Sequence, residues 1–402
     1  MIHMNQNNIH YLAGKQNINT KPLQPFDDTV CLFLNELSKK LRKDKTVVKY
    51  TDIISFAFWC RKSNIENMKQ VQKNSLLRIG RGLIFHIAPS NVPINFAFSY
   101  VFGLLAGNAN IVRVSSKEFR QVNIICNVLN ELFADEKFRK IAEGTQIVSY
   151  EHDDEINQYF SSICDGRVIW GGDNTINELR KFPISSRCVE INFADRYSMG
   201  IVSTDSIINM SDEELQRLAE NFYNDTYLMD QNACSSPHII IWKKDNADVM
   251  KAQKRFWDCV AKCSGKYVLA DIKVSEKFSK LCQAIVNFDE IANVYRYENL
   301  LYIINLSKIS EPLDKYRGIF GMFYQYEIDQ IDELIPFVNS PKIQTLAVSG
   351  IKTSELAEFI VQNGIKGIDR IVPFGKTLDI GTVWDGYNII DTLSRIISFT
   401  DK

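Results

Sequence analysis

One cysteine of this chain stands in a segment whose composition suits nucleophilic chemistry. Cys234 lies among small and amide residues in the run Tyr227-Leu-Met-Asp-Gln-Asn-Ala-Cys-Ser-Ser-Pro237. The apolar, β-branched run from His238 to Trp242 follows and predicts a buried strand. A loop at the mouth of a strand leaves a thiolate within reach of a substrate. Cys234 is therefore a candidate nucleophile, set against the alternative that most cysteines are small core residues.

Two further side chains near predicted strand ends are each open to two interpretations. Asn91 lies between Pro89 and Pro93, which restrict the loop between the first predicted strand and the next helix. Its amide either satisfies the local turn or donates to a carbonyl oxygen as part of an oxyanion hole. His238 is either a base for Cys234 in a hydrolase or acyltransferase, or a satisfied structural histidine. The start of an apolar strand favours the structural interpretation.

The elements that must position these residues alternate between strands and helices from Leu83 onward. Strands are predicted at 83–88, 110–114, 146–150, 168–170, 199–203, 238–242, 301–304 and 344–349, and helices at 30–41, 94–105, 118–133, 212–221 and 247–263. Thr51-Asp52 is predicted to cap a further helix that runs through Trp59. The alternation predicts two α/β units with parallel sheets, dividing shortly before Cys234. Because such sheets bind ligands beyond the carboxyl ends of their strands, a cleft enzyme is indicated.

Composition excludes several other classes. The 402 residues are 45% hydrophobic and carry a net charge of −1, so a large core is expected and the basic surface of a nucleic-acid binder is absent. The first 20 residues lack the apolar core of a signal peptide, and Gly103 and two polar residues interrupt the longest apolar run. Nine cysteines without CxxC pairs favour a reducing cytoplasm. Cys259 and Cys263 have no histidine nearby in the sequence, so no metal site is expected.

Four blocks, in this order, resemble the aldehyde dehydrogenase superfamily, and more closely its LuxC-type branch. That branch comprises the fatty acyl-CoA reductases that supply aldehyde to bacterial luciferase. The blocks are Gly80-Arg-Gly82 with His86-Ile-Ala-Pro-Ser-Asn-Val-Pro93, Gly103 to Ser116, Asp230-Gln-Asn-Ala-Cys-Ser-Ser-Pro237, and Gly367-Ile-Asp-Arg-Ile-Val-Pro373 with Trp384-Asp-Gly386. The resemblance implies a Rossmann-like cofactor domain and a catalytic domain, each with a parallel sheet. We expect an N-terminal arm and helix at 1–50, the dinucleotide-binding domain at 51–226, the catalytic thiol domain at 227–370, and a completing segment at 371–402.

The resemblance also implies roles for particular residues. Cys234 matches the family's nucleophile, and Asn91 matches the asparagine that shares the oxyanion hole with the nucleophile's backbone N–H. The implied cofactor-binding residues are Pro89, Ser90, Arg113, Ser115, Ser116, Lys117, Gly171 and Gly172. Ser116 stands where NAD-using members have a ribose-binding glutamate. Its lack of a carboxylate, with Arg113 and Lys117 able to pair with a 2′-phosphate, favours NADPH over NADH.

Two departures from the family pattern bear on the reaction. Glu190 is the nearest counterpart of the glutamate that serves the oxidative branch as general base, but the Gly-Gly that should follow it is absent. Gly318, in Arg317-Gly-Ile-Phe-Gly321, replaces the glutamate that holds the nicotinamide ribose. Both losses fit a reductase whose acyl group leaves by hydride transfer rather than by attack of water.

The expected activity is therefore NADPH-dependent reduction of a fatty acyl-CoA or acyl-carrier thioester to the aldehyde, through an acyl group on Cys234. The alternatives are a cysteine-dependent acyltransferase or hydrolase, a non-catalytic acyl-carrying subunit, and aldehyde oxidation. The resemblance implies a homo-oligomer and acyl-protein synthetase and thioesterase subunits as partners. We expect a cytoplasmic protein with no nucleic-acid partner and no membrane span.

Overall fold

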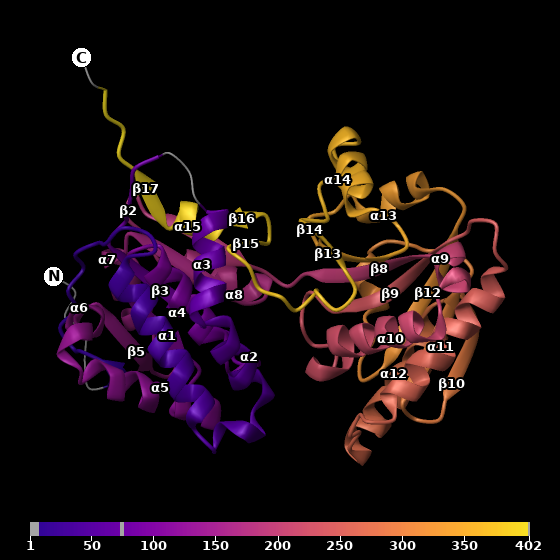
Figure 1. Cartoon of the computed structure of the whole chain (residues 1–402), viewed down its shortest axis with the longest axis horizontal. Helices are drawn as coiled ribbons and strands as arrows, with labels where there is room; N and C mark the ends of the chain where they lie inside the picture. The colour runs from indigo at the N-terminus through magenta and orange to yellow at the C-terminus, as the bar shows by residue number, and fades with distance from the viewer. Residues whose placement is uncertain (1–7, 73–75, 401–402) are drawn as a thin grey trace. The chain divides into compact units, whose positions relative to one another are not determined.

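Apolar strands and amphipathic helices build two α/β units (Figure 1). The computed structural model describes residues 8–72 and 76–400, so residues 1–7 of the predicted N-terminal arm lie outside the described part. The first unit comprises Met1–Ala194 and Gly381–Lys402, and the second comprises Asp195–Ile380. Residues 195–226, predicted as part of the dinucleotide-binding domain, belong to the second unit.

The first unit contains a six-stranded sheet in the order β1-β5-β4-β3-β6-β7. The strands are β1 His10–Gly14, β3 Leu83–Ile87, β4 Ala109–Val114, β5 Thr145–Ser149, β6 Gly166–Trp170 and β7 Val189–Phe193. The pairs from β5 to β7 are parallel, and β1 is antiparallel to β5. Since β4 and β5 extend from one side of β3 while β6 and β7 extend from the other, the strand order reverses at β3. A dinucleotide-binding sheet has its crevice at this kind of switch point.

Helices cover both faces of this sheet. They are α1 Asp28–Lys43, α2 Thr51–Trp59, α3 Lys62–Val71, α4 Asn95–Leu105, α5 Arg120–Phe133, α6 Arg139–Glu143, α7 Asp154–Ile163, α8 Asp173–Arg180 and α15 Ile389–Thr392. On one face Phe85 packs against Phe160 of α7. On the other, the buried ring of His86 is hydrogen-bonded to Ser99 of α4 (Nδ1–Oγ 2.7 Å) and to Asn110 (Nε2–Oδ1 2.9 Å). Strands buried on both faces explain the continuous apolar run that predicted β3.

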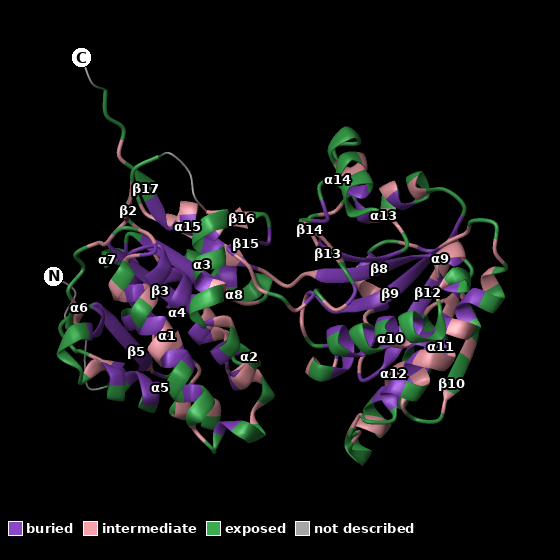
Figure 2. Ribbon diagram, in the orientation of Figure 1, coloured by how far each residue is buried: buried purple, intermediate pink, exposed green. Residues whose placement is uncertain are grey.

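The second unit contains a seven-stranded sheet in the order β10-β11-β12-β9-β8-β13-β14, parallel except for the edge strand β10. The strands are β8 Tyr197–Ser203, β9 Pro237–Lys243, β10 Ile291–Tyr297, β11 Leu301–Leu306, β12 Met322–Ile328, β13 Ile343–Ser349 and β14 Arg370–Pro373. Its helices are α9 Thr204–Asn209, α10 Asp212–Thr226, α11 Val249–Ser264, α12 Asp271–Asn287, α13 Ile335–Val338 and α14 Thr353–Gln362. Ile239 and Ile241 face one core, whereas Ile240 and Trp242 face the other. Figure 2 shows these buried strands between helices with exposed outer surfaces.

The last segment of the chain returns to the first unit. It forms the hairpin β15 Val383–Trp384 and β16 Tyr387–Asn388, and then β17 Ser394–Ile396, which pairs antiparallel with β2 Arg78–Gly80. The Arg78 guanidinium joins this pairing through an ion pair to Asp391 (3.2 Å) and a hydrogen bond from its Nε to the Ser394 hydroxyl (2.9 Å). The predicted completing segment thus contributes to three sheets, since β14 belongs to the seven-stranded sheet of the second unit.

Local sequence explains several of the helix starts. The Thr29 N–H donates to the N-cap Asp27 of α1 (2.8 Å), and Ser211 and Glu214 form a capping box at the start of α10. The cap predicted at Thr51-Asp52 is wrong, because α2 begins at Thr51 and its N-cap residue is Tyr50, whose side chain makes no capping hydrogen bond.

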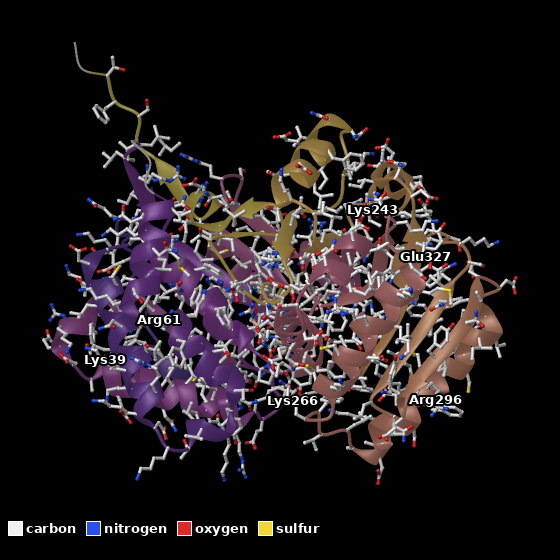
Figure 3. All side chains as sticks on the ribbon, turned by 45° about the vertical axis from the view of Figure 1, so that its right-hand side comes forward. Lys39, Arg61, Lys243, Lys266, Arg296 and Glu327 are labelled. Carbon is white, nitrogen blue, oxygen red and sulfur yellow. The ribbon has the colours of Figure 1, made fainter. Side chains whose placement is uncertain are left out.

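Two further features are the mixed charge of the surface and the length of the helices. Charged side chains of both signs lie over the surface of each unit (Figure 3), in keeping with the balanced composition. Within residues 8–72 and 76–400, no helix combines the length and apolarity needed to cross a bilayer.

Candidate active site

Cys234 lies in the loop between the 3₁₀ turn η4 (Tyr227–Met229) and the start of β9. The residue is half-buried, whereas Cys126 of α5 is buried in the core of the first unit. The Ser198 hydroxyl donates to the Cys234 carbonyl oxygen (2.6 Å) and fixes the backbone at this point. The loop position predicted for Cys234 is therefore the position that the structure shows.

Gln231 links the loop that contains Cys234 to the start of β12 and the residue before it through hydrogen bonds. Its buried side-chain oxygen accepts from the N–H groups of Gly321 (2.7 Å) and Met322 (3.2 Å), and its Nε2 donates to the Met322 carbonyl (3.2 Å). Asp230 and Gln231 both have positive φ, 54° and 59°, in a region that side chains other than glycine adopt only when the surroundings hold them. The amide contacts of Gln231 supply part of that constraint.

Two more side chains tie the same loop down. The Asp230 carboxylate accepts from the Tyr267 hydroxyl and from Lys273 Nζ (2.7 Å) of α12. The Ser236 hydroxyl donates to the Asp225 carbonyl at the end of α10 (2.7 Å). The loop that carries the thiol is therefore anchored on both sides of Cys234.

Asp225 belongs to a buried arrangement behind this loop. Its carboxylate accepts from the N–H groups of Gly375 (2.6 Å) and Thr377 (3.1 Å). Burial raises the pKa of Asp225 to about 6 and outweighs the hydrogen bonds, which act to lower it. The segment after β14 is thus linked to the end of α10 through one carboxyl group.

Asn91 lies in the loop after β3, and its side chain is exposed. The loop backbone is held by hydrogen bonds from Ala88 N–H to Arg113 O (3.0 Å) and from Asn95 N–H to Val92 O (3.1 Å). No hydrogen bond to another described residue holds the Asn91 amide, so the two prolines restrict the backbone but do not fix the side chain. Asn91 belongs to the first unit and Cys234 to the second.

The predicted cofactor-binding residues gather at the carboxyl edge of the first sheet. Pro89 and Ser90 follow β3, and Gly171 and Gly172 follow β6, on the two sides of the switch point. Gly172 is the N-cap residue of α8, and a Cβ added there would face open space. Backbone at this position is therefore open to the close approach of a phosphate group.

The residues after β4 lie at the same edge. The Arg113 guanidinium lies over the Tyr150 ring, 4.7 Å from its centroid, and its buried Nε makes no hydrogen bond within the described part of the chain. Ser116 and Lys117 are exposed, and the Ser115 hydroxyl accepts from the Lys117 N–H (3.2 Å) in a local turn. An anion in this place would find a cationic side chain with one donor still unused.

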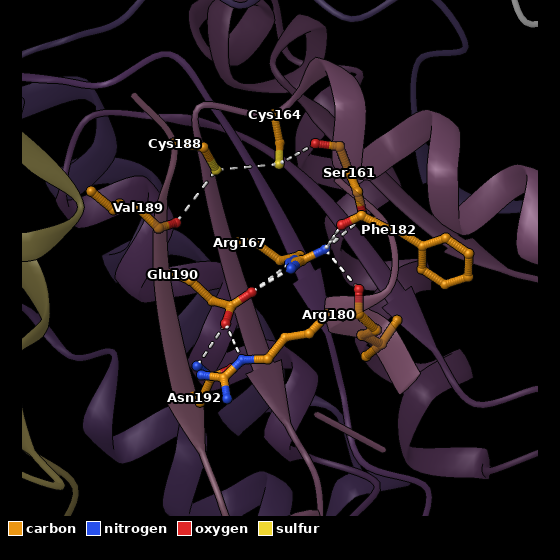
Figure 4. A network of polar contacts seen from close by, with 10 residues as sticks. Ser161, Cys164, Arg167, Arg180, Phe182, Cys188, Val189, Glu190 and Asn192 are labelled. Carbon is orange, nitrogen blue, oxygen red and sulfur yellow. Dashed lines mark hydrogen bonds and ion pairs between the residues drawn. The ribbon is translucent and has the colours of Figure 1, made fainter. Parts of the chain in front are cut away.

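Glu190, the predicted counterpart of a general base, lies on β7 within an ion-pair network (Figure 4). Its carboxylate accepts from Arg167 Nε (2.8 Å) and Nη2, from Arg180 Nε (2.9 Å) and from Asn192 Nδ2 (2.8 Å). Burial acts to raise the pKa of Glu190, but the hydrogen bonds from Asn192, Arg180 and Arg167 outweigh it and lower the pKa. A carboxylate held in this way is suited to fixing β6 and β7, and the general-base role stays a prediction.

His238 is buried at the start of β9 and stacks on Tyr197, with ring centroids 5.3 Å apart. Neither ring nitrogen has a hydrogen-bond partner of ordinary geometry among the described residues, so the expected satisfied histidine is wrong in that respect. Burial, aided by the charges of Arg317 and Lys280, lowers the pKa of His238 to about 3, and the Gly318 backbone offsets this only weakly. The imidazole is therefore neutral at physiological pH.

The predicted site residues lie neither in a cluster of possible metal ligands nor in the two pockets described below. In the part of the chain that the structure describes, no three His, Cys, Asp or Glu side chains gather as a metal site. A hollow of about 390 Å³ lies between α1 and α3, and another of about 560 Å³ lies beside α10 and the ends of β13 and β14. Neither is lined by a predicted site residue.

The loop anchors were not predicted from the sequence. Gln231 and Asp230 stand in the block that resembles the family, which marked the segment but not these roles. The partners of Gln231 lie some 90 residues further along the chain, and no local pattern links the two positions.

Solved structures define the class of fold. The chain is similar to a NAD-dependent benzaldehyde dehydrogenase from Corynebacterium glutamicum, with a TM-score of 0.62, 12% identity, and coverage of 91% of this chain and 83% of that chain. It is also similar to an indole-3-acetaldehyde dehydrogenase of P. syringae, with a TM-score of 0.64, 14% identity, and coverage of 92% and 82%. The fold is that of the aldehyde dehydrogenases, with a Rossmann-like and a catalytic α/β domain.

Sequence comparison then gives the family. The family model for acyl-CoA reductase (LuxC) matches residues 33–396, and the chain belongs to this family. Curated relatives include the long-chain acyl-protein thioester reductases of Aliivibrio fischeri, 22% identical over 332 residues, and of Vibrio harveyi, 23% identical over 327 residues. Each alignment covers 79% of this chain and 64% of the relative, so the chain spans just under two thirds of those proteins. The family and the fold predicted from the sequence are confirmed.

Proposed function

We propose that this protein reduces a fatty acyl-CoA or acyl-carrier thioester to the aldehyde with NADPH, through an acyl group carried on Cys234. The observation that carries the proposal is the half-buried Cys234 in a loop anchored by Gln231, Asp230 and Ser236. The names of the relatives, long-chain acyl-protein thioester reductases, support the choice of a thioester substrate. An acyl-protein synthetase and a thioesterase are proposed as partners, and the proposed assembly is a cytoplasmic homo-oligomer.

The first chemical step is thioester exchange. The Cys234 thiolate attacks the acyl carbonyl carbon, a new carbon–sulfur bond forms, and the bond to the carrier sulfur breaks. The carrier leaves as a thiolate and takes up the proton that Cys234 gave up. Because the leaving and attacking groups are both thiols, no strong acid is required. The Cys234 N–H and the Asn91 amide would donate to the oxyanion, each such donor being worth roughly 10²–10³ in rate.

Reduction then releases the acyl group. Reduced nicotinamide, when bound, supplies the hydride that adds to the acyl carbon on Cys234 and leaves a tetrahedral oxyanion. The oxyanion re-forms the carbonyl and breaks the carbon–sulfur bond, which frees the aldehyde and leaves Cys234 as the thiolate that begins the next turnover. The engaged carboxylate of Glu190 disfavours hydrolysis as the competing fate, since it is not free to activate water.

The residues at the carboxyl edge fit a phosphorylated dinucleotide. Gly171 and Gly172 would receive the pyrophosphate at the start of α8, and the open space beside Gly172 allows its approach. The positive charges of Arg113 and the exposed Lys117 would favour a 2′-phosphate next to Ser116. NADPH is therefore proposed in preference to NADH.

The experiment measures NADPH oxidation with acyl-CoA substrates of increasing chain length, together with transfer of a labelled acyl group to the protein. Cys234→Ser is expected to abolish both the labelled thioester and NADPH consumption. The matched control, Cys282→Ser, alters an exposed cysteine and is expected to leave both unchanged. Undiminished acyl labelling of Cys234→Ser would overturn the assignment. Labelling of wild type without NADPH consumption would favour the acyl-carrying subunit instead.

A further inference from the structure

Two thiols of the first unit point toward each other beside the Glu190 network (Figure 4). The sulfur atoms of Cys164 and Cys188 are 3.8 Å apart. Each thiol also contacts a carbonyl oxygen, Cys164 that of Ser161 (3.3 Å) and Cys188 that of Val189 (3.5 Å). The rotamers that bring the two sulfurs together are therefore held by the backbone around them.

The strand register explains why these cysteines meet. Gly166 of β6 pairs with Val189 of β7, and the Val189 N–H donates to the Asp165 carbonyl (3.3 Å). Cys188 thus lies beside Asp165 and diagonally opposite Cys164, and both cysteines lie just before the paired strands β6 and β7. Adjacent strands are roughly 4.8 Å apart, and a disulfide joins Cα atoms about 4.4–6.8 Å apart. The register is therefore compatible with a disulfide between the two thiols without a change in strand pairing.

The two thiols differ in exposure. Cys164 is buried, whereas Cys188 is half-buried and open to a small reagent. The contact with the Cys164 thiol lowers the pKa of Cys188, and the nearby Arg167 guanidinium acts in the same direction, while burial and the carboxylates of Asp165 and Glu190 oppose them. Because the thiolate is the reactive form, Cys188 is the attacking thiol of the pair and Cys164 the resolving one.

We propose that Cys164 and Cys188 form a reversible disulfide on exposure to a hydroperoxide. This modification site is separate from Cys234 and does not depend on the proposed function. The Cys188 thiolate attacks the terminal peroxide oxygen, the O–O bond breaks, and the alkoxide or hydroxide that leaves takes up a proton. The Cys164 sulfur then attacks the resulting Cys188 sulfenic acid, the S–S bond forms, and hydroxide leaves and takes the Cys164 proton. The two thiols together lose two electrons and two protons, and the peroxide is reduced to an alcohol or water plus water.

The disulfide would covalently close the segment between Cys164 and Cys188 in the first unit. It closes a loop of 24 residues in sequence separation that contains β6 and α8 and ends two residues before Glu190. Disulfides that close loops of this size stabilise the folded state chiefly by restricting the unfolded chain. Oxidation is therefore expected to raise the melting temperature.

The experiment treats the full chain with hydrogen peroxide at a small molar excess, blocks the remaining thiols, and maps the peptides by mass spectrometry. The expected result is one cross-linked peptide pair joining Cys164 to Cys188, lost on treatment with dithiothreitol, with a raised melting temperature before reduction. Cys282, exposed and unpaired with any other thiol in the described structure, is the internal control and should be oxidised without forming this cross-link. Equal alkylation of Cys164 and Cys188 before and after peroxide, with Cys282 oxidised, would overturn the proposal.

Two variants distinguish the attacking thiol from the resolving thiol. In Cys164→Ser, Cys188 has no resolving thiol, so its sulfenic acid should accumulate and be trapped by dimedone. In Cys188→Ser, dimedone should not label Cys164. Labelling of Cys164 rather than Cys188 would overturn the assigned order of attack, and the wild-type mapping tests the disulfide itself even where a variant does not fold.

Discussion

The two loops that carry the proposed catalytic groups are held in different ways. Around Cys234, side chains of the loop contact the segment before β12, the end of α10 and α12, and the amide of Gln231 makes three hydrogen bonds with backbone groups. Around Asn91, backbone hydrogen bonds hold the loop, and the exposed side chain makes no hydrogen bond to another described residue. The thiol loop is therefore organised before substrate arrives, whereas the amide loop is free to adjust.

This difference fits the proposed division of labour. A covalent intermediate requires the sulfur to stay in one position through both half-reactions, and preorganisation of this kind accounts for much of enzymatic rate enhancement. A loop beside a cofactor crevice must admit and release a nucleotide in each turnover. Removing a contact from the anchored loop should therefore affect stability and rate together, while changes in the other loop should affect rate alone.

The largest effect is expected from Asn91→Ala. Loss of an oxyanion donor should lower kcat for acyl transfer by about 10²–10³, with no change in melting temperature, because the side chain makes no hydrogen bond to the other residues that the structure describes. The measurement is single-turnover acylation of Cys234 alongside thermal unfolding. Asn64→Ala, which removes an amide bonded to the Trp59 carbonyl (2.7 Å), is the contrasting control and should affect stability but not rate. An unchanged rate in Asn91→Ala would remove Asn91 from the oxyanion hole.

Gln231→Ala should show the opposite combination. It leaves the buried N–H of Gly321 without an acceptor, whereas the Met322 N–H keeps the Ile319 carbonyl (3.0 Å). A buried group left unsatisfied costs about 1–3 kcal/mol of unfolding free energy. The displaced loop should also lower the acylation rate by at least tenfold, on the order of what a small misplacement costs. Gln121→Ala, which loses one hydrogen bond to Asp52 (3.3 Å), is the matched control. Wild-type stability and rate in Gln231→Ala would show that the anchor is dispensable.

Ser116→Glu tests the nucleotide preference of the first unit. A carboxylate next to the 2′-phosphate should raise the KM for NADPH relative to NADH by about tenfold, equivalent to about 1.4 kcal/mol. The measurement compares initial rates with the two cofactors. Ser162→Glu adds the same charge to an exposed position on α7 and should leave the ratio unchanged. An unaltered ratio in Ser116→Glu would place the ribose elsewhere.

The two buried histidines, one in each unit, make the stability of the protein depend on pH. Burial lowers the pKa of His238 to about 3 and that of His86 to about 4, below the ordinary value of 6.5. Each folded-state pKa is depressed, so the stability that each histidine contributes is fully present above about pH 6.5 and is lost as the pH falls toward the folded pKa. The slope is at most about 1.4 kcal/mol per pH unit for each group.

His238→Phe should therefore unfold less readily than wild type near pH 5.5, by about 1 kcal/mol, because it keeps a ring on Tyr197 and removes the titrating group. His86→Phe should be destabilised even at pH 7.5, because Ser99 and Asn110 lose their partner. Denaturant titrations at the two pH values measure both effects. Parallel pH profiles for wild type and His238→Phe would contradict the assigned shift.

Local patterns predicted strands that are buried on both faces and helices that have a regular apolar face. Leu83–Ile87 and Pro237–Lys243 are apolar on both faces, so their sequences alone identify them. The strand Met322–Ile328 was missed because it carries a buried polar residue, Gln325, whose amide is satisfied by Trp242, Trp257 and residues of other elements. A sequence does not show that such a residue has partners until the fold has brought them together.

The candidate site divides in the same way. Cys234 and the carboxyl-edge residues were predictable because loop position and family resemblance both point to them. Glu190 was assigned from its place in the chain, but its surroundings, two arginines and an asparagine, depend on the pairing of β6 with β7. Gln231 could not be assigned a role, because its hydrogen-bond partners are backbone groups some 90 residues away in the sequence.

The return of the C-terminal segment to β2 has a consequence for synthesis on the ribosome. The strand β2, which contains Arg78, cannot pair with β17 until the ribosome has added Ser394, 316 residues further along the chain. Residues 195–380 emerge as one uninterrupted stretch and need nothing from either end of the polypeptide for their sheet. We therefore expect the portion translated in the middle to be folded while the portion translated first still lacks its last strand.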